Sequence, residues 1–124
     1  MGYKMPVPKE SAEQTTLFSW AQMQSCKYPE LRLLYHIPNG GSRHKIEAAH
    51  LRAEGVKPGV PDICLPVARG GFHGLYIEMK RQRGGRVSEN QESWLSDLSA
   101  QGYKTAVCKG WQPAAEIIMQ YLEG

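Results

Sequence analysis

The feature that most constrains the fold is a pair of short apolar segments, 62–67 and 75–80, on either side of a glycine-rich stretch. In both segments every second residue is apolar, which is the period of a β-strand with two unlike faces. The glycines in the intervening segment 68–74 favour a turn. We therefore predict a β-hairpin, and a turn centred on Gly70 places Asp62 opposite Glu78.

Strand alternation also predicts that the two faces of this hairpin differ chemically. Lys80 follows Glu78 by two residues and therefore lies on the same face. Ile77 and Met79 point the other way, into an apolar core. The hairpin is thus expected to bury one side and to gather Asp62, Glu78 and Lys80 on the other.

These three residue types suit metal-dependent phosphodiester hydrolysis of the PD-(D/E)xK kind. Two carboxylates on neighbouring strands form an oxygen-ligand site for Mg²⁺ or Mn²⁺. An ion held by Asp62 and Glu78 can polarise a phosphate and lower the pKa of a bound water from about 15.7 towards neutrality. Lys80 would orient that water or stabilise charge on the phosphoryl oxygens. The backbone carbonyl of Met79 could supply a further ligand.

A plainer interpretation places Glu78 and Lys80 on a solvated strand edge and Asp62 in a turn after Pro61, because so short a motif is common by chance. The register, the alternation and a third acid favour the catalytic interpretation.

The third acid is Glu13, which shares the apolar face of the first predicted helix with Leu17 and Trp20. An acid that faces inward needs a partner, and a metal ion or Lys80 is a reasonable one. The alternative is that Glu13 simply interacts with the dipole at the first helical turn.

The other elements follow from capping patterns, glycines and apolar periodicity. Strands are predicted over 33–37, 62–67, 75–80 and 103–108. Helices are predicted from a capping box at Ser11 to about Cys26, from a cap at Ser42 to Gly55, from a capping box at Ser88 to near Gly102, and from Pro113 through Tyr121. The order α-β-α-β-β-α-β-α implies one α/β domain over residues 1–124, with a mixed sheet flanked by helices and a probable arm over 1–10.

Gln91 has two interpretations that the residues alone leave open. It lies three positions after Ser88, where a glutamine side chain completes a capping box. It could equally contact the active site. Neither interpretation is favoured at this point.

Basic residues flank the expected centre on both sides, although the formal net charge of +3 is only a weak bias towards polyanions. At the start of a helix, backbone N–H groups and the dipole favour phosphate. The other basic residues lie in the loop before Asp62 or directly after Lys80. Such charge runs are often only solvated faces, but their position here predicts DNA contacts by Arg43, Lys45, Lys57, Arg81, Arg83 and Arg86.

Several other functions are disfavoured. The three cysteines are far apart and lack zinc-ligand spacing. There is no nucleophile motif, no GxxxxGK[ST] loop and no histidine-metal arrangement. No apolar run approaches the roughly 18 residues of a membrane-spanning helix, and no signal-peptide pattern is seen. We therefore expect an intracellular, cytoplasmic protein that does not enter a membrane.

Five motifs in order resemble the VRR-NUC domain (virus-type replication-repair nuclease): PNGGSR at 38–43, GVKPGVPD at 55–62, YIEMKR at 76–81, SENQESWL at 88–95 and GY at 102–103. The resemblance implies a restriction-endonuclease-like α/β fold and Mg²⁺- or Mn²⁺-dependent activity. It implies that Asp62, Glu78 and Lys80 are catalytic. It also assigns the family's helix acid to Glu13 and its Gln-x-x-Trp to Gln91 and Trp94.

Single-domain members of this family, such as those encoded by bacteriophages, resemble Holliday-junction resolvases. We therefore expect a structure-selective DNA endonuclease, and paired cuts in a four-way junction favour a C2 homodimer. The alternatives are a flap or nicking nuclease with the same site, and a catalytically idle DNA-binding module.

Overall fold

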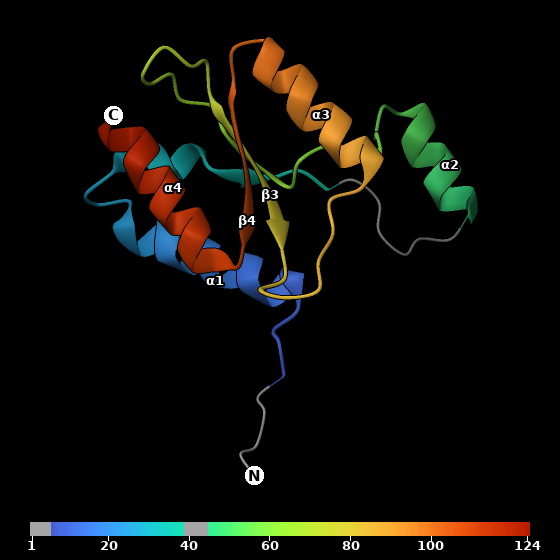
Figure 1. The fold of residues 1–124 in the computed structure, drawn as a ribbon, viewed down its shortest axis with the longest axis horizontal. Helices are drawn as coiled ribbons and strands as arrows, with labels where there is room; N and C mark the ends of the chain where they lie inside the picture. The colour runs from blue at the N-terminus through green and yellow to red at the C-terminus, as the bar shows by residue number, and fades with distance from the viewer. Residues whose placement is uncertain (1–5, 39–44) are drawn as a thin grey trace.

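The computed structural model describes residues 6–38 and 45–124 (Figure 1). The helices and strands follow the predicted order, with one added 3-10 helix before the first strand, so the mixed α/β class is confirmed. The elements in chain order are α1 (Glu10–Gln24), η1 (Pro29–Leu33), β1 (Tyr35–His36), α2 (Lys45–Ala53), β2 (Ile63–Leu65), β3 (Leu75–Lys80), α3 (Glu89–Ala100), β4 (Lys104–Lys109) and α4 (Trp111–Glu123).

The four strands form one mixed sheet in the order β1-β2-β3-β4. β2 pairs antiparallel with both β1 and β3, whereas β3 and β4 run parallel. Ile63 pairs with Ile77 and Leu65 with Leu75, which is the predicted hairpin register. Asp62, the residue before β2, therefore reaches the level of Glu78.

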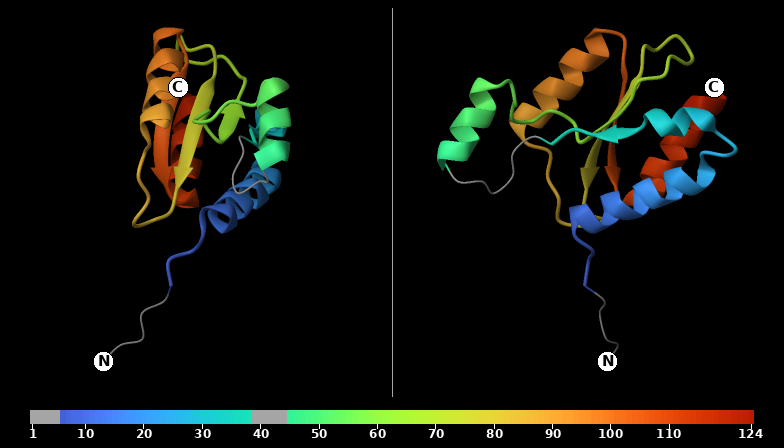
Figure 2. Two further views of the ribbon diagram at one scale, coloured as in Figure 1. Left: turned by 90° about the vertical axis from the view of Figure 1, so that its right-hand side faces the viewer. Right: turned by 180° about the vertical axis from the view of Figure 1, so that it is seen from behind.

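The sheet separates two unequal layers (Figures 1 and 2). α1 and α4 pack on the face that carries the apolar side chains of β2 and β3 and enclose the main core. Leu17, Leu65, Ile77 and Ile118 in that core are completely buried. α3 lies on the opposite side of the sheet beside β4, and α2 stands further out with no buried side chain among its described residues.

The three predicted caps had different outcomes. Ser88 forms the expected capping box with Gln91 at the start of α3, which is confirmed. The box predicted at Ser11 is wrong, because α1 already begins at Glu10 after the extended Lys9 and has no side-chain cap. The cap predicted at Ser42 lies outside the described residues.

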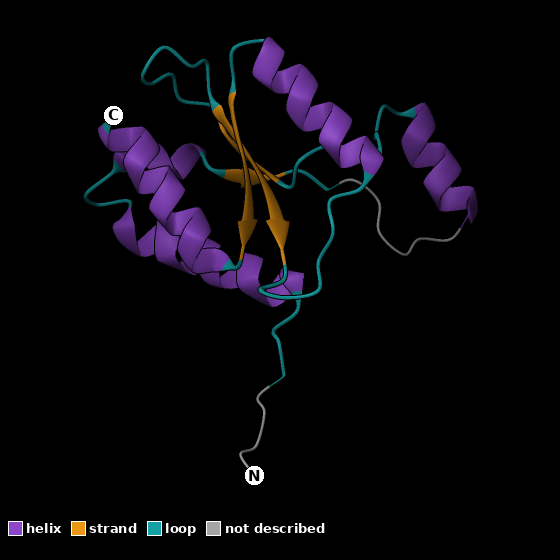
Figure 3. Cartoon of the chain, viewed as in Figure 1, coloured by secondary structure: helices purple, strands orange, loops and turns teal. Residues whose placement is uncertain are grey.

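Figure 3 shows the extent of each helix and strand, and prolines lie at three of the boundaries that differ from the prediction. Pro29 begins η1, so only two residues of the predicted first strand join the sheet. Pro66 has no N–H to donate and follows directly after the end of β2. Pro113 is the third residue of α4 instead of the first, at a position that needs no backbone donor.

The described helices include none that is long and apolar enough to cross a membrane.

Candidate active site

Glu78 and Lys80 lie at the C-terminal end of β3 and are almost completely buried. Only 2% of Glu78 and 7% of Lys80 is exposed to solvent. A charged residue on a solvated strand edge would be largely exposed. The plainer interpretation of these two residues is therefore excluded.

Asp62 is half-buried and is held in place by its neighbouring strands. Its Oδ2 atom accepts a hydrogen bond from the backbone N–H of Met79 at 2.8 Å. Its backbone carbonyl accepts from the N–H of Ile37 at 2.6 Å and lies 2.8 Å from Nδ1 of His36. Both β1 and β3 thus fix the position of this carboxylate.

The carboxylate of Glu78 has two unequal oxygens. Oε1 accepts a hydrogen bond from Nε2 of Gln91 at 2.8 Å and lies 3.8 Å from Nζ of Lys80. Oε2 is buried and has no hydrogen-bond partner in the described part of the chain. Burial and the nearby carboxylate of Asp62 raise the pKa of Glu78 to about 8, while Lys80 opposes this shift.

An unsatisfied oxygen on a buried carboxylate is costly unless a cation or a donor occupies the space beside it. The two neighbouring carboxylates of Asp62 and Glu78 are hard oxygen donors, which is the chemistry that Mg²⁺ and Mn²⁺ prefer. The residues present therefore fit a divalent cation.

The described residues contain no cluster of three or more His, Cys, Asp or Glu side chains that could hold a metal. A cation here would thus have two side-chain ligands and would need others, such as a backbone carbonyl or solvent. The carbonyl of Met79 remains a candidate because this residue lies between Glu78 and Lys80.

The side chain of Gln91 performs both of the functions that the sequence left open. Its Oε1 accepts from the backbone N–H of Ser88 at 2.9 Å, which completes the capping box. Its Nε2 donates to Glu78. Helix capping and contact with Glu78 are therefore not exclusive.

Glu13 faces inward as expected, with only 4% of the residue exposed, but its partners differ from those we expected. Its Oε2 accepts from the backbone N–H of Trp111 at 2.8 Å, and its Oε1 accepts from Nε2 of Gln82 at 3.2 Å. The structure thus brings Asp62, Glu78, Lys80 and Gln91 together and gives Glu13 separate contacts.

Four of the basic residues predicted to bind DNA are exposed in the loops next to Asp62 and Lys80. Arg81, Arg83 and Arg86 are exposed in the loop between β3 and α3, and Lys57 is exposed in the loop before Asp62. The guanidinium of Arg81 also donates to the backbone carbonyl of Val7 at 3.4 Å, which ties this loop to the N-terminal segment. Lys45 is the first residue of α2, and Arg43 lies outside the described residues.

Sequence reasoning missed two residues that shape this region. Gln82 was not singled out, although it contacts Glu13. Gly59 has a φ of +88°, and a Cβ atom there would lie 2.7 Å from the backbone carbon of Asn90. This glycine lets the loop before Asp62 pack directly on the first turn of α3. The Pro-Gly dipeptide at 58–59 indicates a turn but not the packing partner.

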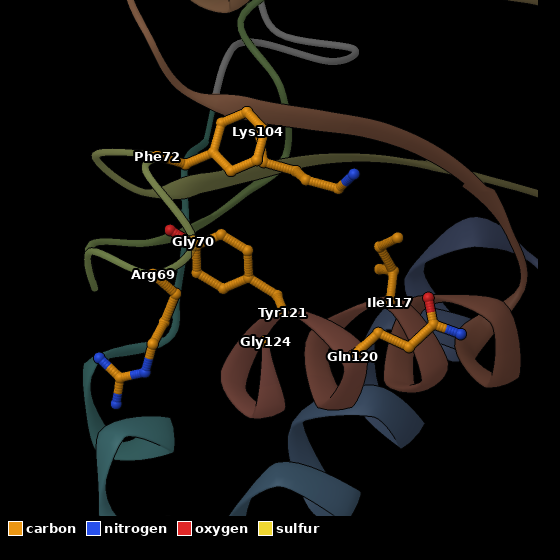
Figure 4. Close-up of a pocket in the computed structure, with 8 residues that line it drawn as sticks. All are labelled: Arg69, Gly70, Phe72, Lys104, Ile117, Gln120, Tyr121 and Gly124. Atoms are coloured by element: carbon orange, nitrogen blue, oxygen red, sulfur yellow. The ribbon is translucent and has the colours of Figure 1, made fainter.

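A separate hollow of about 170 Å³ lies at the far end of the sheet (Figure 4). One of its residues, Lys104, pairs with Leu75 at the opposite end of β3 from Lys80. The hollow therefore lies apart from Asp62, Glu78 and Lys80. Its lining comes from the hairpin tip, the start of β4 and the end of α4: Arg69, Gly70, Phe72, Lys104, Ile117, Gln120, Tyr121 and Gly124.

Comparisons with known proteins identify the family of this chain. The family model of the VRR-NUC domain matches residues 8–112. A solved structure named "VRR_NUC domain protein" is 31% identical in sequence, with a TM-score of 0.83, and the match covers 96% of this chain and 92% of that chain. Among curated proteins no match is found.

Proposed function

Because this chain belongs to the VRR-NUC family of PD-(D/E)xK nucleases, we propose that it is a metal-dependent endonuclease that hydrolyses phosphodiester bonds in DNA. The catalytic residues in this proposal are Asp62, Glu78 and Lys80, and the cation is Mg²⁺ or Mn²⁺.

The observation that carries the proposal is the buried Oε2 atom of Glu78, which lacks a partner among the described residues beside the carboxylate of Asp62. Two neighbouring carboxylates repel each other and resist burial, so either Glu78 takes up a proton, as its raised pKa indicates, or a cation compensates both charges. The arrangement costs stability in the metal-free protein. Binding of a divalent cation would explain why the protein contains this destabilising arrangement.

A bound cation would polarise the scissile phosphate and acidify an attacking water. Asp62 and Glu78 would hold it, together with the backbone carbonyl of Met79. The ammonium group of Lys80, 3.8 Å from Oε1 of Glu78, is close enough to the cation site to stabilise negative charge on the phosphate. Gln91 orients the carboxylate of Glu78 through its 2.8 Å hydrogen bond.

The substrate backbone would be held by basic side chains from three segments. Lys57 precedes the catalytic strands, and three arginines follow β3 in an exposed loop. Cationic side chains in such loops can bind phosphates without reading the bases. The proposed contacts are Arg43, Lys45, Lys57, Arg81, Arg83 and Arg86.

We further propose that the preferred substrate is branched DNA such as a four-way junction, and that the enzyme acts as a C2 homodimer. The support is general: residues 6–38 and 45–124 form one sheet and its flanking helices with no further element that would read bases, and two symmetric cuts require two active sites. A flap or nicking nuclease would use the same residues on a single strand. A catalytically idle DNA-binding module is disfavoured because it would not need the buried carboxylate of Glu78.

The test is cleavage of a labelled four-way junction, a flap and a linear duplex in Mg²⁺, in Mn²⁺ and in EDTA. The proposal predicts metal-dependent paired cuts in the junction, and a protein that sediments as a dimer of the 13.9 kDa chain. Preferential cutting of flaps by a monomer would contradict the junction and dimer proposals but would still support nuclease activity. Tight binding without cleavage of any substrate would leave only the binding module.

A further inference from the structure

Glu13 is a buried acid outside the group formed by Asp62, Glu78 and Lys80. Both of its carboxylate oxygens have hydrogen-bond partners, the backbone N–H of Trp111 at 2.8 Å and the side-chain amide of Gln82 at 3.2 Å. Trp111 is the first residue of α4. A negative charge at a helix N-terminus is stabilised by the free N–H groups and by the helix dipole. The carboxylate is therefore satisfied without a metal ion.

The partners of Glu13 are attached to the backbone on both sides of Lys80. Gly110, the residue before Trp111, donates its backbone N–H to the carbonyl of Lys80 at 3.0 Å. Gln82 follows Lys80 by two residues in the chain. The carboxylate of Glu13 thus joins α1 and the start of α4 to the end of β3, where Lys80 lies.

Close packing leaves little freedom in this group of contacts. A Cβ atom on Gly110, whose φ is +104°, would lie 2.8 Å from Oε2 of Glu13 and 3.1 Å from Cγ of Gln82. On the other side, a Cβ atom on Gly85 would lie 3.2 Å from Cβ of Lys80. The end of β3 is therefore held between the Glu13 contacts and the loop that contains Gly85.

We propose that Glu13 is a positioning residue for Lys80, and that it acts through Trp111, Gly110 and Gln82 instead of binding the metal. This inference rests on the proposed function, because Lys80 must be catalytic for its position to affect the rate. It replaces the metal or Lys80 side-chain contact that the sequence suggested for this acid. The Glu13 contacts fix the backbone of Lys80, and the backbone fixes where the ammonium group lies.

The test compares Glu13→Ala, Glu13→Gln and Gln82→Ala with wild type, with Glu116→Gln as the control for loss of an acid on an exposed surface. The first readout is the single-turnover cleavage rate with the protein in saturating excess over DNA. A displacement of about 1 Å near the reacting atoms can cost on the order of 100-fold in rate. We expect Glu13→Ala to slow cleavage about 10- to 100-fold with little change in the protein concentration that gives half the maximal rate, and Gln82→Ala to slow it less.

Glu13→Gln distinguishes hydrogen bonding by the side chain of Glu13 from metal binding by its negative charge. Its amide oxygen can still accept from the N–H of Trp111, and Gln82 can reverse its amide to remain a partner, so we expect most of the rate to return. The second readout is Mn²⁺ affinity measured by calorimetry without DNA. We expect Glu13→Ala and Glu13→Gln to bind Mn²⁺ as wild type does, whereas Asp62→Asn binds it much more weakly.

The third readout is a double-mutant cycle with Lys80→Ala. If Glu13 acts through Lys80, the Glu13→Ala substitution causes little further loss once Lys80 is absent. An equal loss in both backgrounds, an unchanged rate, or a fall in Mn²⁺ affinity like that of Asp62→Asn would overturn the proposal.

Further controls distinguish misfolding of a variant and failure of the proposed function from failure of this inference. If circular dichroism shows that Glu13→Ala does not fold, Gln82→Ala, whose residue is exposed, takes its place in the cycle with the same expected pattern. A wild-type protein that cleaves no DNA in any metal would refute the proposed function and this inference together. If wild type cleaves DNA and Glu13→Ala, Glu13→Gln and Gln82→Ala all cleave it at the wild-type rate, this inference alone is refuted.

Discussion

The side-chain amide of Gln91 donates a hydrogen bond to Oε1 of Glu78 at 2.8 Å while its carbonyl oxygen caps α3. One residue therefore determines both where the helix begins and how the buried carboxylate is oriented. This double contact links the position of α3 to the geometry of the proposed metal site.

Substitution of Gln91 by Glu should separate the two contacts. Glutamate can still complete the capping box, but it replaces the amide donor to Glu78 with a second negative charge. We expect cleavage to fall about 10- to 100-fold, as is typical for residues that orient metal ligands, while α3 keeps its capping box.

Ser88→Ala is the matched control for Gln91→Glu. It removes the cap and should lower the free energy of unfolding by about 1 kcal/mol, with cleavage nearly unchanged because the amide of Gln91 remains. Thermal unfolding and single-turnover rates measured together test the pair. Loss of activity in Ser88→Ala equal to that in Gln91→Glu would show that the two contacts cannot be separated.

The raised pKa of Glu78 predicts how the stability of the metal-free protein depends on pH. Folding raises this pKa from 4.5 to about 8, so the fold favours the protonated acid. The contribution of this protonation to the free energy of unfolding is fully present below the ordinary pKa of 4.5 and is lost as pH rises through about 8.

Thermal unfolding in EDTA at a series of pH values would test this dependence. Wild type should lose stability relative to Glu78→Gln as pH rises, and the Mn²⁺ affinity of wild type should increase over the same range because the cation displaces a proton. If the stability of wild type and of Glu78→Gln changes with pH in the same way, the raised pKa of Glu78 is contradicted.

Much of this site could be predicted from local sequence patterns. Strand alternation and the glycine-rich turn were sufficient to predict the register of β2 and β3, and hence the approach of Asp62 to Glu78. Ser88 could be identified because a capping box depends only on residues four positions apart or closer. These features are local, and their geometry follows from backbone periodicity.

The partners of Glu13 could not be predicted in the same way. Its periodicity showed that it faces inward, but Trp111 lies 98 residues away in the chain. The contact depends on how α1 and α4 pack together, which no local pattern encodes. The same is true of Gly59 and Asn90, where a turn signal does not reveal that another segment approaches the glycine.

Gly59→Ala should lower both stability and activity. The substitution forces a positive φ on alanine and places its Cβ 2.7 Å from the backbone of Asn90, so we expect a loss of about 1–3 kcal/mol in the free energy of unfolding. The displaced loop also carries Asp62, so cleavage should fall. Chemical denaturation measures the first effect and a cleavage assay the second.

Gly55→Ala is a close control because Gly55 has a φ of +108° but nothing within 4 Å of its Cβ position. It should share the backbone strain without the collision. Equal losses in the two variants would mean that contact with α3 contributes nothing at Gly59.

Tyr121→Phe should affect stability without affecting cleavage. The buried hydroxyl of Tyr121 donates to the carbonyl of Val67 at 2.5 Å, and its loss should cost about 1 kcal/mol. This contact lies beside the hollow at the far end of the sheet. A marked loss of cleavage in this variant, measured at a temperature where it is folded, would show that the hollow contributes to activity.

The most direct test of the central claim is single-turnover cleavage of a labelled four-way junction in Mn²⁺ by wild type and by Asp62→Asn. Asparagine preserves an acceptor for the N–H of Met79, so the fold should persist while one anionic ligand is lost. We predict that wild type cleaves in Mn²⁺ but not in EDTA, and that Asp62→Asn is inactive in both. Cleavage by the folded Asp62→Asn protein at the wild-type rate, or wild-type cleavage in EDTA, would contradict a catalytic metal site at Asp62 and Glu78.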